Sequence, residues 1–282
     1  MRNERRLATA ILGLCLIATA APAAPDSGAT PPLRVCADPN NLPFSNRAGK
    51  GFENELAEMI ARELDTEVEY TWWAQRRGFI RNTLNAGECD LVAGVPAGYE
   101  LVETTRPYYC STYVFVQPEP RRRQPLRALS DERLRQLTIG VHLVGDDGAN
   151  PPPAHALGQR GIVDNVVGYM IYGDYRDPNP PARLVEAVNR GHVDVAAVWG
   201  PIGGYFARRS EPPLHIEPIT GSASVPFRFA IAMGVRKGDT DLRDDIQSIL
   251  DQRRDDIRVL LLRYDLPLVD DGACADEVSD HD

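Results

Sequence analysis

The sequence lacks most features of membrane-spanning, nucleic-acid-binding and metal-binding proteins. Its one notable apolar run, residues 7–21, is too short to cross a bilayer. The five histidines are widely spaced and no CxxC pair occurs, so a metal site is not expected. The formal charge of −9 argues against binding nucleic acid through bulk charge.

Residues 1–24 have the pattern of a secretory signal peptide. A basic start at 2–6 precedes the apolar run, and the small residues at 21–23 form a cleavage signal. A leucine precedes Cys15, where a lipoprotein signal needs a small residue. Removing three arginines and one glutamate with the leader takes the charge from −9 to −11. We therefore expect an exported, soluble, periplasmic protein without a membrane anchor.

Four cysteines remain after the leader, Cys36, Cys89, Cys110 and Cys274. An even number in an oxidising compartment predicts two disulfides, with three possible pairings. Cys36 lies in the first predicted strand and Cys89 at the start of the third, and these strands are neighbours in a doubly wound sheet. Pairing these two is geometrically reasonable, and the remaining pair would then tie the tail to the first lobe. The sequence leaves the pairing open.

The first third of the chain reads as a βαβαβ unit. Strands are predicted over 34–37, 68–73 and 90–95, with a helix over 52–64 and a second helix before the third strand. Polar and aromatic residues follow each strand. Since open parallel sheets bind ligands at the carboxyl ends of their strands, this pattern predicts a binding cleft.

A second α/β unit follows, and the chain ends in an acidic tail over 271–282. The further predicted elements are strands over 108–116, 137–143, 166–173, 193–199 and 224–234, and helices over 129–137, 155–166, 182–190, 205–209 and 239–262.

This succession resembles the periplasmic solute-binding proteins of the type II class. In that class the second lobe interrupts the first, and the last strand and helix return to the first lobe. The resemblance implies an α/β, two-lobed fold with a central cleft and two hinge crossings. It places lobe 1 at 33–116 plus 225–270 and lobe 2 at 117–224.

A more specific resemblance covers nearly the whole chain after the leader. The chain resembles the quinoprotein-dehydrogenase-associated MoxJ and XoxJ group in two long blocks, residues 34–46 (RVCADPNNLPFSN) and 70–79 (YTWWAQRRGF). Five shorter blocks show the same resemblance, at 95–99, 104–109, 173–175, 179–181 and 198–201. Proteins of that group are encoded beside periplasmic PQQ-dependent methanol dehydrogenases and are associated with their maturation or activation. The resemblance implies such a methanol or alcohol dehydrogenase as partner, with its cytochrome c as a further candidate. We expect no cofactor of the chain's own. We expect the protein alone to be a monomer.

Two charged anchors of the amino-acid-binding relatives are missing. In those proteins an arginine follows the third strand and an aspartate follows the last strand of the second lobe. Here the corresponding stretches 95–100 and 199–201 contain neither residue. Because a buried zwitterion without partners costs several kcal/mol per ion, an amino-acid ligand is disfavoured.

The candidate cleft residues are instead mostly aromatic and polar. Following the strand ends, they are Asn40, Asn41, Phe44, Trp73, Gln75, Arg76, Arg77 and Tyr99 in the first lobe, and His142, Trp199 and Tyr205 in the second. Such a lining suits a planar or apolar ligand, or a protruding piece of a partner protein. Helix capping or surface ion pairs also account for the two arginines. Glu53 reads as helix-end electrostatics.

Three functions are compatible with this pattern. The first is an accessory protein that binds or activates a PQQ-dependent methanol or alcohol dehydrogenase. The alternative is a receptor of an ABC importer for a small aromatic or alcohol-derived solute. The third, an enzyme, lacks a visible nucleophile–base pair, and a lone histidine such as His142 is more often structural, so no catalytic residue is expected.

Overall fold

The fold is built on one mixed sheet whose strands fall into two groups. The computed structural model describes residues 30–119, 124–143, 151–170, 176, 178–220, 225–270 and 274. The predicted signal peptide 1–24 lies outside the described residues, as does the acidic tail 271–282 apart from Cys274.

The strands are β1 (Leu33–Ala37), β2 (Asn40–Asn41), β3 (Ser45–Asn46), β4 (Val68–Trp72), β5 (Leu91–Pro96), β6 (Glu103–Thr104), β7 (Tyr109–Gln117), β8 (Ile139–Leu143), β9 (Val166–Met170), β10 (Val195–Trp199), β11 (His215–Pro218) and β12 (Arg228–Val235). The helices are α1 (Phe52–Glu63), α2 (Phe79–Asn82), α3 (Pro152–Gln159), α4 (Ala182–Asn189), α5 (Gly200–Arg209), α6 (Thr240–Gln252) and α7 (Arg254–Arg263), with short 3-10 helices at Leu84–Ala86 and Glu132–Gln136.

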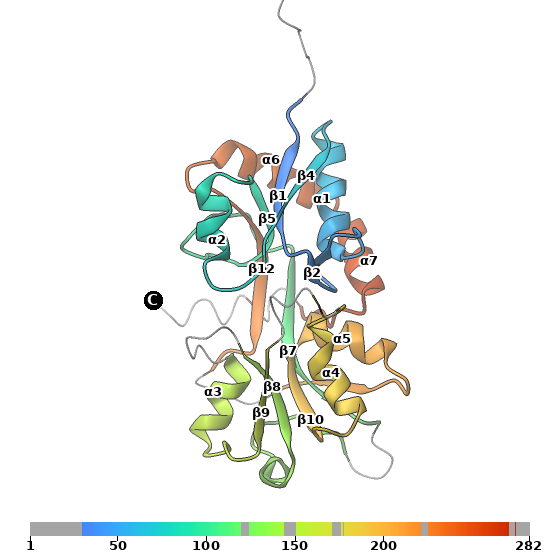
Figure 1. The fold of residues 1–282 in the computed structure, drawn as a ribbon. Coiled ribbons are helices and arrows are strands. Elements are labelled where there is room, and N and C mark those ends of the chain that lie inside the picture. The colour runs from blue at the N-terminus through green and yellow to red at the C-terminus, as the bar shows by residue number, and fades with distance from the viewer. Residues whose placement is uncertain are drawn as a thin grey trace, which may run out of the picture. The chain divides into compact units, whose positions relative to one another are not determined.

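The main sheet has the order β4-β1-β5-β12-β7-β10-β8-β9, as Figure 1 shows. The parallel strands β4, β1 and β5 form the first half and the parallel strands β10, β8 and β9 form the second half. The long strand β7 pairs with β12 through Thr112 and with β10 from Tyr113 onward, so it passes from one half to the other. The predicted α/β architecture with two halves is confirmed. The division into 33–116 plus 225–270 and 117–224 stays a prediction.

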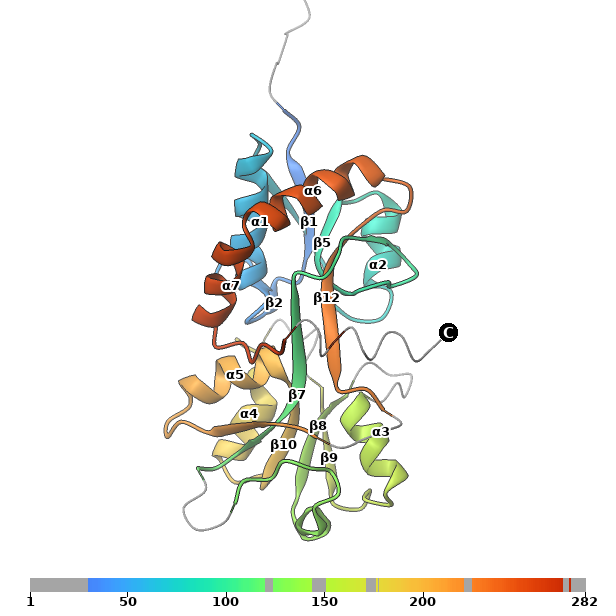
Figure 2. The same ribbon diagram turned by 180° about the vertical axis from the view of Figure 1, so that it is seen from behind.

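The two faces of the sheet are packed differently. On one face, α1, α6 and α7 of the first half and α4 and α5 of the second half share a single continuous apolar core (Figures 1 and 2). On the other face each half has its own cluster, one around Phe79 and Leu84 and one around Leu134 and Leu157. The halves are therefore joined through one side of the sheet.

Three helix predictions had wrong bounds. The helix expected over 155–166 is α3, which begins earlier and ends at Gln159. The stretch 239–262 is not one helix, because α6 ends at Gln252 and α7 begins at Arg254. Arg253 at the break pairs with Glu63 of α1 through its Nε, 3.0 Å away. The break turns α7 toward α1, where Tyr264 at its end reaches Glu55. The predicted helix over 129–137 shortens to the 3-10 helix Glu132–Gln136.

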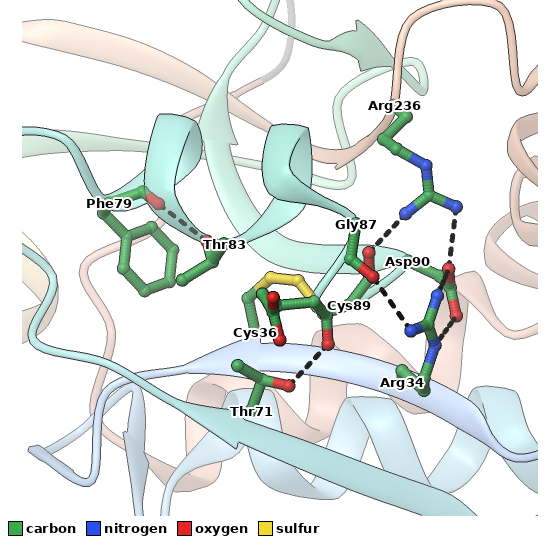
Figure 3. The surroundings of a disulfide bond; sticks show 10 residues. Arg34, Cys36, Thr71, Phe79, Thr83, Gly87, Cys89, Asp90 and Arg236 are labelled. Carbon is green, nitrogen blue, oxygen red and sulfur yellow. Dashed lines mark hydrogen bonds and ion pairs between the residues drawn. A yellow bond between two sulfur atoms is a disulfide. The ribbon is translucent and has the colours of Figure 1, made fainter.

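Both disulfides form in the structure, as Cys36–Cys89 and Cys110–Cys274. The first lies between β1 and the start of β5, which are neighbours as expected. Asp90 beside it receives hydrogen bonds from Arg34 at 2.6 Å and from Arg236 at 2.8 Å (Figure 3). These contacts join the beginnings of β1 and β5 to the end of β12.

Within the described part of the chain, we find no helix with both the length and the apolar character needed to cross a membrane.

Candidate functional site

The loops that follow β1 and β4 form a polar network. Asp38, the first residue after β1, accepts hydrogen bonds from the backbone N–H of Asn40 at 2.8 Å and of Gln75 at 2.7 Å. The Asn41 side chain donates to Gln75 Oε1 at 2.8 Å. Parallel pairing of β1 with β4 explains the arrangement, since it places the carboxyl ends of both strands together. Three predicted residues, Asn40, Asn41 and Gln75, thus meet around Asp38.

Asp38 was missing from the predicted set. Its side chain is buried, and burial raises the pKa of its carboxyl, although the backbone N–H groups of Gln75 and Asn40 act in the opposite direction. Its place as the first residue after a strand was the signal that could have found it.

A second carboxyl group, that of Glu53, lies close to this network. Glu53 stands in the first turn of α1, and a Cβ added to Gly94 of β5 would lie 2.4 Å from its Oε1. Only glycine at position 94 therefore lets the carboxyl lie against the strand. Burial, and then the charge of Asp38, raise the pKa of Glu53 to about 8. At neutral pH Glu53 consequently keeps its proton and can donate a hydrogen bond, which goes beyond the helix-end role expected from its sequence position.

The other predicted residues of the first half divide into exposed and buried ones. Trp73 and Tyr99 are 41% and 37% exposed, and Arg76 and Arg77 are exposed beside Trp73. Phe44 is buried in the core, where its ring lies 5.5 Å from that of Phe52. The four exposed side chains lie at the surface, whereas Phe44 packs the loop onto α1.

In the second half, Trp199 and His142 belong to an aromatic cluster. Its members, Tyr113, His142, Trp199, Phe227 and Phe229, come from or next to β7, β8, β10 and β12. The Tyr113 ring is central, with centroids 5.3 Å from Trp199 and 6.3 Å from His142. The sequence did not identify Tyr113, Phe227 and Phe229 because their strands contribute from distant parts of the chain.

His142 is held in its neutral form. It is buried, and burial lowers its pKa to about 4. A histidine with that pKa is uncharged at neutral pH and packs as a flat ring against Tyr113. Among the described residues, no group of three His, Cys, Asp or Glu side chains is placed to hold a metal ion.

Tyr205 has different neighbours from the other predicted residues. Its ring stacks on Tyr264, with centroids 5.9 Å apart, and the guanidinium of Arg209 lies 3.8 Å above it. Tyr205 therefore connects α5 to the segment after α7.

Comparison with known proteins agrees with this geometry. The family model of the bacterial extracellular solute-binding proteins, family 3, matches residues 33–262. Protein MoxJ of Methylorubrum extorquens is 29% identical over 88% of this chain and 84% of its own length, and Protein MoxJ of Paracoccus denitrificans is 27% identical over 91% and 95%. The crystal structure of the periplasmic binding protein XoxJ from Methylobacterium extorquens AM1 is similar with a TM-score of 0.70 and 32% identity, over 85% of this chain and 100% of XoxJ. This chain belongs to family 3 of the bacterial extracellular solute-binding proteins, and within it to the MoxJ and XoxJ group.

Proposed function

We propose that this protein is a periplasmic accessory protein that binds a PQQ-dependent methanol or alcohol dehydrogenase and supports its activation without catalysing a reaction itself. The secretory pattern of residues 1–24 supports the periplasmic location. The resemblance to the MoxJ and XoxJ group supports the choice of partner, since that group accompanies such dehydrogenases.

The observation on which the proposal rests is the set of side chains at the strand ends of the first half. Trp73 and Tyr99 are exposed there, and so are Arg76 and Arg77, which follow Trp73 closely in the sequence. Exposed aromatic and arginine side chains are the residue types that contribute most to protein–protein binding. The turn after β5 holds no arginine, and the stretch 199–201 at the end of β10 holds no aspartate.

A second candidate is a solute receptor of an ABC importer. The family as a whole consists of solute-binding proteins. Asn40 and Gln75, which are half-buried beside Asp38, are polar residues to which a small ligand could hydrogen-bond. When the concentration of a bound solute is 100 times its dissociation constant, binding adds about 2.7 kcal/mol to the free energy of unfolding. A thermal-shift screen of small aromatic compounds and alcohols would therefore reveal such a ligand.

Affinity capture tests the accessory function. The tagged mature protein should retain the dehydrogenase from a periplasmic extract of its host. The double variant Trp73→Ala/Tyr99→Ala should capture at least about tenfold less of the dehydrogenase, as expected for interface hot spots. Val163→Ala is the matched control, because Val163 is 57% exposed but precedes β9 at the opposite end of a strand. Failure to retain any dehydrogenase subunit, or an equal loss with the control, would contradict the proposal.

A further inference from the structure

The segment after α7 connects the two halves. We call residues 264–269 the strap. The Tyr264 hydroxyl oxygen lies 2.7 Å from Glu55 Oε1 of α1 and 2.9 Å from the Lys50 carbonyl oxygen, and its one proton can be donated to either acceptor. Its ring stacks on Tyr205 of α5. Figure 2 shows α7 ending beside α5. Tyr264 thus touches a helix of each half at once.

The backbone of α5 approaches the strap very closely. A Cβ on Gly204 would lie 2.0 Å from the carbonyl oxygen of Asp265, and a Cβ on Gly200 would lie 2.7 Å from Pro267 Cγ. A distance under 3 Å leaves no room for a side chain on α5 at either position. Gly204 therefore permits a backbone contact between α5 and the strap that any other residue would prevent, and Gly200 lets the Pro267 ring lie against α5.

The far end of the strap is fixed to β7, which crosses between the halves. Ser111 Oγ donates to the Pro267 carbonyl at 2.8 Å, and the Val269 N–H donates to the Cys110 carbonyl at 3.1 Å. The disulfide Cys110–Cys274 repeats this connection covalently. The strap is consequently held at its start by α1, along its length by α5 and at its end by β7.

Apolar packing contributes more to this connection than charge. Leu266 of the strap is buried in the same core cluster as Phe52 of α1 and Ile202 of α5. The ion pair between Arg209 and Asp265 spans 2.7 Å, but its side chains are 42% and 36% exposed, and exposed pairs contribute little. Opening the halves on this side would expose a continuous core.

We propose that the strap holds the two halves at one fixed angle, so that the protein presents its strand ends to a ligand or partner without opening and closing. Solute receptors with this architecture ordinarily close around their ligands by hinge motion. Here the strap adds a third connection to β7 and β12. The proposal does not depend on which molecule the protein binds.

A distance measurement between the halves tests the strap. Spin labels are attached through non-canonical amino acids at exposed positions 62 (α1) and 160 (next to α3), with both disulfides intact, and distances are measured by pulsed electron paramagnetic resonance. The unaltered protein should give one narrow distribution. Gly204→Ala should widen the distance distribution about twofold or more, because losing the contact between α5 and the strap would let the halves move relative to each other. Gly158→Ala is the control, because a Cβ there meets no atom within 4 Å.

Two results would overturn the proposal. One is a broad or two-peaked distribution in the unaltered protein. The other is a folded strap variant whose distribution is as narrow as that of the control. Should Gly204→Ala show no cooperative thermal transition, Tyr205→Leu replaces it, since that change removes the stacking on Tyr264 without introducing a backbone clash.

Discussion

Glu53 carries its proton at a pH where most glutamates have lost theirs. Its carboxyl lies against Gly94, close enough to Asp38 for the two charges to interact, and both features favour the neutral form. The N-terminus of α1 acts in the opposite direction, because helix dipoles stabilise negative charge at this end. Burial and the neighbouring carboxylate prevail, with a pKa of about 8.

The raised pKa of Glu53 predicts a specific pH dependence of stability. The folded state binds the proton more tightly than the unfolded state, so the free energy of unfolding should fall as the pH rises from about 4.5 to about 8, by at most about 1.4 kcal/mol for each pH unit. The Glu53→Gln variant keeps a neutral side chain and should lose less stability across this range. Urea unfolding at about pH 5 and about pH 9 measures the difference.

The control for Glu53 is Glu58→Gln on the same helix, since Glu58 is 59% exposed. The free energy of unfolding of Glu58→Gln should change between the two pH values by the same amount as that of the unaltered protein. Parallel curves for Glu53→Gln and the unaltered protein would show that Glu53 ionises as an ordinary glutamate. Part of the Glu53 side chain stays in contact with water, so the measured effect should be smaller than full burial would give.

For single residues, the sequence predicted which side chains lie at the strand ends better than it predicted what surrounds each of them. Asn40, Asn41 and Gln75 do meet, because the rule that strand ends converge depends only on topology. The same rule could not separate exposed Trp73 from buried Phe44, since burial depends on which helix covers each loop. The proximity of Glu53 and Gly94 comes from the packing of α1 on β5, which no local pattern reveals.

At the scale of elements, the order of strands and helices followed from the sequence, but some boundaries did not. The apolar spacing in α6 continues into α7, with Ile249, Leu250, Ile257 and Leu261 all buried, so periodicity alone indicates one helix. The break at Arg253 depends on tertiary packing, because α7 changes direction there and packs against α1. Strand β11 was missed because it is an edge strand with half-exposed side chains.

Three elements, β1, β5 and β12, are joined by the carboxylate of Asp90. Although burial acts to raise the pKa of Asp90, hydrogen bonds from Arg34 and Arg236 lower it below the ordinary value. Asp90→Asn should reduce the free energy of unfolding by about 1–2 kcal/mol at neutral pH, because two partly buried arginines lose the carboxylate that they share and keep only their other contacts. Denaturant unfolding measures this loss, which should shrink in acid as the pH falls through the lowered pKa of Asp90 and its carboxyl becomes protonated.

Asp244→Asn is the matched control for Asp90. Asp244 also pairs with an arginine, Arg243, at 2.7 Å, but it is 67% exposed. Its replacement should change stability by less than about 0.5 kcal/mol. Equal losses for the two variants would indicate that burial between the strands adds nothing to the Asp90 interaction.

At the scale of the whole molecule, the shared core predicts cooperative unfolding. Residues of both halves, such as Leu56 and Val198, belong to one apolar cluster. Neither half can unfold without exposing surface of the other, so calorimetry should show one transition whose van't Hoff and calorimetric enthalpies agree. Two resolved transitions would show that the halves are energetically independent.

The disulfide Cys110–Cys274 can form only after nearly the whole chain has been synthesised. Cys89 follows its partner Cys36 after 53 residues, so that bond can close while most of the chain is still being made. Cys110 must wait for 164 further residues before its partner exists. A chain that ends before residue 274 leaves Cys110 as a lone thiol and lacks the covalent link between the end of the chain and β7.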